Sequence, residues 1–98
     1  MLVKVNNIEG NNVRVTKLDI DDFGSVIPLK ELNLRLPQDD ESVDQTLRHS
    51  VYAILFTADD SEVDGSTIIL ARSMTQEELN EEKERTVQAV QGKTEDTK

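Results

Sequence analysis

The sequence predicts an α+β fold: a small antiparallel sheet of about five strands, rich in hairpins and either open or barrel-like, followed by one C-terminal α-helix. Short apolar segments separated by turn residues fill the first three quarters of the 98-residue chain. A helix-start signal follows near Thr75, and residues 1–70 contain 25 of the 28 Leu, Ile, Val and Phe residues. We expect one domain at residues 1–91 and a flexible polar tail at residues 92–98. A small all-β barrel with an appended helix is the alternative.

The first two strands are expected at residues 2–8 and 13–20, as a hairpin joined by a glycine and asparagines that tolerate positive φ. In the second strand the apolar alternation changes phase between Val15 and Leu18. A slip of one residue turns a whole face of a strand outward. The sequence therefore predicts a bulge or bend near Thr16–Lys17.

A third strand is expected after a turn at residues 21–25. Within residues 29–36, Leu32, Leu34 and Leu36 alternate with the polar residues Asn33 and Arg35. This alternation is typical of a half-buried strand. Pro37, which cannot donate a hydrogen bond to a sheet, is expected to end it.

The segment from residue 41 to residue 57 carries both helix and strand signals. Ser42 and Gln45 fit a capping box, and apolar residues follow at a helical spacing of four. Residues 51–57 are instead β-branched and aromatic, with apolar side chains on both faces. We predict a short helical turn or loop at about residues 41–46 and a central strand at about residues 47–57. A last strand is expected at residues 66–73, which completes a second hairpin.

The C-terminal helix is predicted at about residues 76–91. Thr75 is its N-cap, and Glu78 completes a capping box three residues later. Gly92 is a suitable stop. The helix carries only a thin apolar stripe, which includes Leu79 and Val87. Such a stripe predicts either loose packing on the sheet or pairing with another subunit.

Composition and charge exclude several classes of function. The chain has no cysteine, so a thiolate nucleophile and a zinc–thiolate site are excluded. Its net charge of −9 disfavours direct binding of nucleic acid or an anionic membrane. The N-terminal residues lack the apolar run of a signal peptide, and Val51–Phe56, the longest apolar run, is far too short to cross a membrane. We expect a cytoplasmic protein, or a component of a particle assembled inside the cell.

A calcium site is the first chemistry to test, because Asp60, Glu62, Asp64 and Gly65 match the front half of an EF-hand loop. Ala71 occupies the position where that loop needs a bidentate glutamate, and the flanking residues resemble strands. We therefore expect no metal site and interpret the stretch as a polar turn between strands. Val63, apolar in the middle of this loop, is a candidate contact residue.

Catalysis is not predicted. His49 is the only histidine, and no nucleophile signature surrounds the serines. Carboxylates are abundant, but no pair among them is singled out as a catalytic acid and base. The four glycines are scattered, so no phosphate-binding loop is present. We expect no enzyme activity, no catalytic residue, no cofactor and no small-molecule substrate.

Sixteen of the 20 acidic residues fall into four acidic groups. The groups are Asp19, Asp21 and Asp22; Asp39, Asp40, Glu41 and Asp44; Asp59, Asp60, Glu62 and Asp64; and Glu77, Glu78, Glu81, Glu82 and Glu84. Local preferences of loops and helix starts for acidic residues explain much of this pattern. If the groups converge on one face, they would suit a basic protein partner or mimic the phosphates of a nucleic acid.

We predict a non-enzymatic protein–protein interaction or assembly module, as in small bacterial or phage accessory proteins. Its partner would be a protein with a basic surface or a second copy of the chain. An acidic inhibitor that mimics nucleic acid is the alternative. The candidate partner-binding residues are Glu62, Val63, Asp64, Leu79, Glu82, Val87 and Val90.

Overall fold

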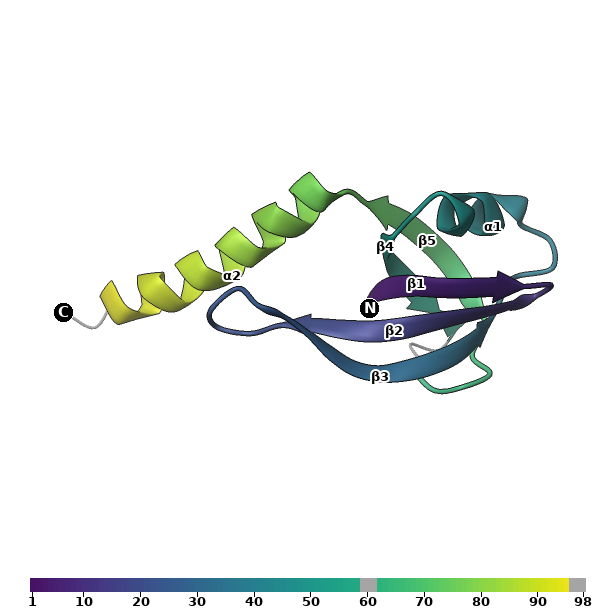
Figure 1. Ribbon diagram of the computed structural model, residues 1–98, viewed down its shortest axis with the longest axis horizontal. Helices are drawn as coiled ribbons and strands as arrows, with labels where there is room; N and C mark the ends of the chain where they lie inside the picture. The colour runs from purple at the N-terminus through teal and green to yellow at the C-terminus, as the bar shows by residue number, and fades with distance from the viewer. Residues whose placement is uncertain (59–61, 96–98) are drawn as a thin grey trace.

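The structure, a computed structural model, describes residues 1–58 and 62–95, with side chains described as far as Ala89. It is a five-stranded antiparallel sheet followed by a C-terminal helix, which confirms the expected fold class (Figure 1). A second helix precedes the fourth strand. The elements in chain order are β1 (Leu2–Glu9), β2 (Asn12–Ile20), β3 (Val26–Arg35), α1 (Glu41–Arg48), β4 (Tyr52–Thr57), β5 (Ile68–Met74) and α2 (Gln76–Glu95).

The strands lie in the order β3-β2-β1-β4-β5, and each neighbouring pair is antiparallel. The sheet is curled but not closed into a barrel. Its two edges meet at one end, where the segment before β5 runs beside the end of β3. The Arg35 N–H donates to the Ser66 carbonyl at 2.8 Å, and the Gly65 N–H donates to the Asn33 carbonyl at 2.7 Å. The Asn33 N–H donates to the Asp64 carboxylate at 2.9 Å.

The bulge or bend expected near Thr16–Lys17 of the second strand is found in the neighbouring strand instead, opposite Lys17 and Leu18. Lys17 pairs with Lys30 of β3, but Leu18 pairs with Pro28, so Leu29 is an extra residue in β3. Strand β2 itself alternates without interruption, so Leu18, three residues after Val15, lies on the outer face of the curled sheet, away from the main core.

The main core fills the inside of the curl. Its side chains are aliphatic and come from β1–β5, α1 and the segment between β3 and α1: Val3, Val13, Val15, Leu32, Leu34, Leu36, Val43, Leu47, Ala53, Leu55 and Ile68. Leu18, Met74 and Leu79 are also buried but do not belong to this cluster. Leu79 is the one buried side chain of α2 within residues 76–89.

Residues 47–50 were expected at the start of the central strand, and this prediction is wrong. Helix α1 extends to Arg48 and β4 begins only at Tyr52. The helix begins earlier than the capping box suggested: Asp40 is the N-cap and accepts a hydrogen bond from the Ser42 N–H. The Ser42 hydroxyl and N–H hold the pKa of Asp40 below its ordinary value. Val43 and Leu47, four residues apart, place one face of α1 in the core.

Helix α2 begins as expected. The Glu78 N–H donates to the Thr75 hydroxyl at 3.2 Å, and the Thr75 N–H donates to the Glu78 carboxylate at 3.3 Å. The helix continues through Gly92 to Glu95, because a glycine weakens a helix by only about 1 kcal/mol and does not force an end. It projects from the sheet beside the β2–β3 hairpin (Figure 1). The molecule is therefore elongated, with extents of 53 × 25 × 20 Å.

Candidate protein-interaction site

The β2–β3 hairpin ends in a turn that is held by its own hydrogen bonds. The Asp21 carboxylate accepts from the N–H groups of Phe23 at 3.0 Å and Ser25 at 2.8 Å. The Gly24 N–H donates to the Asp21 carbonyl at 3.0 Å, and the Asp21 N–H donates to the Ser25 carbonyl at 2.9 Å. Gly24 has a φ of 80°, which favours glycine. The backbone of the turn is thereby fixed in one conformation. We call residues 21–25 the hairpin tip.

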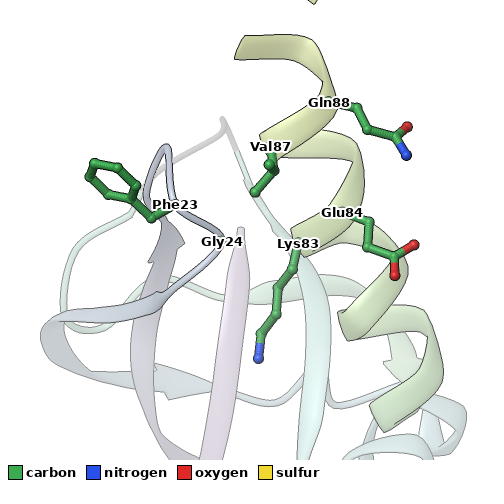
Figure 2. Close-up of a pocket in the computed structure, with 6 residues that line it drawn as sticks. All are labelled: Phe23, Gly24, Lys83, Glu84, Val87 and Gln88. Carbon is green, nitrogen blue, oxygen red and sulfur yellow. The ribbon is translucent and has the colours of Figure 1, made fainter. Parts of the chain in front are cut away.

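Phe23 stands at the hairpin tip with its side chain in solvent. The residue is 89% exposed, the most exposed of the large apolar residues that the structure describes. In Figure 2 its ring points away from α2 rather than into the hollow beside it. Burying a phenylalanine side chain contributes about 1.5–3 kcal/mol of favourable free energy, and folding of this chain does not bury Phe23. An ordered turn that presents an aromatic ring to solvent is typical of a contact site.

Helix α2 supports the hairpin tip from one side. A Cβ atom placed on Gly24 would lie 3.1 Å from Val87 Cγ2 and 3.6 Å from the Lys83 carbonyl oxygen. Figure 2 shows Val87 pointing toward the tip, whereas Glu84 and Gln88 point to the far side of the helix. An open hollow of about 490 Å³ lies between the two elements, lined by Phe23, Gly24, Lys83, Glu84, Val87 and Gln88. Gly24 is thus the point at which the tip and α2 approach each other closely.

The structure separates the candidate residues into two places. Val87 lies at the hairpin tip, and Glu82 lies on the same helix, where it accepts a hydrogen bond from Arg85 at 2.6 Å. Leu79 is 1% exposed, so we leave it out of any contact surface. The side chain of Val90 lies outside the described residues.

Among the loop residues, Asp64 lies beside the far end of β3, where it accepts from the Asn33 N–H, whereas Glu62 reaches Lys17 of β2. Asn33 is nine residues from Gly24 along the chain, roughly 30 Å for an extended strand. Val63 is 57% exposed. This loop and the hairpin tip are thus separate surfaces.

Sequence reasoning missed Phe23. The available signal was an aromatic residue inside DDFGS, a stretch of turn residues that has no apolar alternation to bury it. That pattern indicates a turn but not whether the ring folds back onto the protein. Only the path of α2, which passes Gly24 and leaves Phe23 uncovered, decides this.

Glu62 forms an ion pair with Lys17 of β2. The hydrogen bond from the Lys17 ammonium holds the pKa of Glu62 below 4.5, its ordinary value. A carboxylate whose pKa is lowered in the folded state stabilises the fold at pH values above its ordinary pKa. This stabilisation is lost as the pH falls through the lowered pKa. Both side chains are partly exposed, so we expect the pair to contribute about 0.2–1 kcal/mol.

We predict that Glu62→Gln lowers the free energy of unfolding by that amount at pH 7 and that the difference disappears in acid. Urea unfolding of both proteins at a series of pH values measures this difference. A difference that stays constant down to acid pH would contradict the assigned ion pair.

No group of three or more His, Asp or Glu residues that could hold a metal ion occurs within residues 1–58 and 62–95. In the calcium-like stretch, Asp64 is already engaged by the Asn33 N–H, and Asp59 and Asp60 lie outside the described residues. His49 is exposed at the C-cap of α1.

The described members of the four acidic groups are spread over the molecule. The first group surrounds the hairpin tip, and the fourth lies on the helix that passes it. Asp39 and Asp40 of the second group line a hollow with Arg35 and Thr67, near Asp64 of the third group. Several carboxylates are engaged within the chain, in the pairs Lys17–Glu62, Arg48–Asp44, Arg72–Glu78 and Arg85–Glu82. The described acidic residues therefore do not form one face.

No protein-family model matches the chain, and comparison with curated proteins and with solved structures finds no significant match. Neither helix, over the residues described, is long and apolar enough to cross a membrane.

Proposed function

We propose that this protein is a non-enzymatic protein–protein interaction or assembly module whose contact element is the hairpin tip. The observation that carries the proposal is Phe23, an 89% exposed aromatic ring on a turn fixed by four hydrogen bonds. Binding a partner would remove this ring from water without first ordering the turn. Ordering a flexible loop on binding costs free energy, so a turn that is already ordered binds with less of this loss.

The chemistry around Phe23 suggests the kind of partner. Asp19 and Asp22 are exposed on either side of the Asp21 carboxylate that holds the turn. A matching surface would offer an apolar depression for the ring, with lysine or arginine at its rim. Aromatic residues are among those that contribute most to binding at interfaces. We propose the cytoplasm, or a particle assembled inside the cell, as the setting, in keeping with a small bacterial or phage accessory protein.

Mimicry of nucleic acid, the alternative from the sequence, gains no support from the position of the acidic groups. Mimicry requires carboxylates in a continuous array, and the described acidic residues are instead distributed over the hairpin tip, α2, the hollow at Arg35 and the contact with Lys17. Four of their carboxylates are also paired with basic residues of the same chain.

Affinity capture from the native host tests the proposal. We expect Phe23→Ala to lose at least tenfold of the partner signal, since loss of a buried aromatic contact costs about 2 kcal/mol or more. Its free energy of unfolding should change by less than about 0.5 kcal/mol, because the residue is 89% exposed. Val51→Ala, which removes another exposed apolar side chain, is the matched control and should retain the partners. Equal capture by all three proteins would contradict the proposed site.

A further inference from the structure

The outer face of β4 and β5 is the second exposed apolar surface. Phe56 and Leu70 are paired across the two strands and are 46% and 55% exposed. On the same face, the next pair along the strands is Ile54 and Arg72. All four side chains point away from the core, because the residues between them, Leu55 and Ala71, face inward.

This face carries positive charge in a protein whose net charge is −9. Arg72 lies one row from Phe56 and Leu70, and Lys4 of β1 lies on the same face beside Tyr52. No carboxylate occurs at the outward positions that β4 shares with β1 and β5; Glu78 of α2 reaches Arg72 from the rim at 3.6 Å. We call Lys4, Ile54, Phe56, Leu70 and Arg72 the outer face.

The hairpin tip and the outer face are complementary in charge and in apolar character. The tip offers an aromatic ring with Asp19 and Asp22, and the outer face offers exposed apolar side chains with Arg72 and Lys4. Phe56 and Leu70 of the outer face also lie away from the tip, whereas Lys4 lies nearer to it, in a hollow with Val26. Leu70 is three residues from Thr67, which pairs with Arg35 at the end of β3 farthest from the tip (Figure 1).

We propose that the partner of the hairpin tip is the outer face of a second copy of this chain; this inference rests on the proposed function. Phe23 of one copy would pack against Phe56 and Leu70 of the next, with Asp22 near Arg72. The tip and the outer face are different surfaces, so the contact is heterologous. In a pair of copies, one keeps an unused tip and the other an unused outer face, so further copies can add to form a chain or a ring.

The contact is expected to be weak in dilute solution. A turn inserted into an apolar patch buries less than the standard interface of about 800 Å² per partner, and such small contacts are transient. Two copies also repel through their net charge, although at about 0.15 M salt this repulsion is screened beyond about 8 Å. Association should therefore depend strongly on concentration.

Sedimentation velocity of the purified protein tests the proposal. At concentrations rising to about 1 mM, in the range where small transient interfaces associate, the average mass of the wild type should grow past that of a dimer. Phe23→Ala removes the tip contact, and Leu70→Glu places a carboxylate in the outer face opposite the acidic tip. Each variant alone should associate at least tenfold more weakly, while Val51→Ala should match the wild type.

An equimolar mixture of the two variants is the decisive measurement. Phe23→Ala retains an outer face and Leu70→Glu retains a tip, so the mixture should form dimers and nothing larger. A wild type that remains monomeric, a variant that associates like the wild type, or a mixture that remains monomeric would overturn the proposal. If the wild type is monomeric but capture from the host still requires Phe23, self-association fails and the proposed function stands. If both experiments fail, the proposed function fails as well.

Discussion

Leu47→Ala is expected to lower the free energy of unfolding by about 2–5 kcal/mol, the range found when a buried leucine is truncated. Leu47 is 1% exposed and belongs to the main core, where it attaches α1 to the inside of the curled sheet. Alanine favours helix more than leucine does, so the loss comes from packing and not from helix propensity. Small domains have a total stability of only about 5–15 kcal/mol, so this variant should be largely unfolded on mild heating. Urea unfolding followed by circular dichroism measures the change.

Gln45→Ala is the matched control for this prediction. Gln45 lies on the exposed side of the same helix, and its replacement should change the free energy of unfolding by less than about 0.5 kcal/mol. Equal effects of the two substitutions would mean that α1 does not contribute to the core.

Gly24→Ala is expected to lower the free energy of unfolding by about 2–3 kcal/mol. About 1–2 kcal/mol arises because an alanine at a φ of 80° is strained. The added methyl group would also lie 3.1 Å from Val87 Cγ2, and at this half-buried contact we expect a cost of about 1 kcal/mol, the low end of the range for overpacked cores. Since the strained φ and the contact with Val87 both act on the backbone of the hairpin tip, the position of Phe23 should change and partner binding should weaken as well. Urea unfolding measures the first effect and affinity capture the second.

Gly10→Ala separates the two contributions to this loss. Gly10 also has a positive φ, 57°, but nothing lies within 4 Å of a Cβ atom placed on it. This variant should lose only the conformational part, about 1–2 kcal/mol, and should bind partners normally. If Gly10→Ala and Gly24→Ala were equally destabilised, α2 would not support the hairpin tip.

Much of the fold follows from local sequence patterns. The alternation in the first hairpin is set by residues close together in the chain and was predictable, whereas the bulge expected near Thr16–Lys17 lies across from these residues in β3. The start of α2 was predictable as well, because Thr75 and Glu78 satisfy each other across one turn. Each of these signals acts over a few residues and needs no tertiary contact to be interpreted.

What the sequence did not indicate depends on contacts between distant residues. The boundary between α1 and β4 was misplaced because Leu47 and the residues that follow suit either a helix or a strand, and only the core decides between them. The meeting of β3 with the segment before β5 joins Arg35 to Ser66, far apart in the chain. Val87 was a candidate contact residue for its apolar character, but its place beside Gly24 follows from the path of α2.

Photo-crosslinking from position 23 in the native host is the most direct test that the hairpin tip binds a protein. Phe23 is replaced by a photoreactive phenylalanine derivative, and the same residue at Val51, which is 60% exposed, is the control. We predict a discrete crosslinked protein from position 23, either a second copy of the chain or another protein, and none from position 51. No product from position 23, or the same products from both positions, would contradict the assignment of Phe23 as the contact residue.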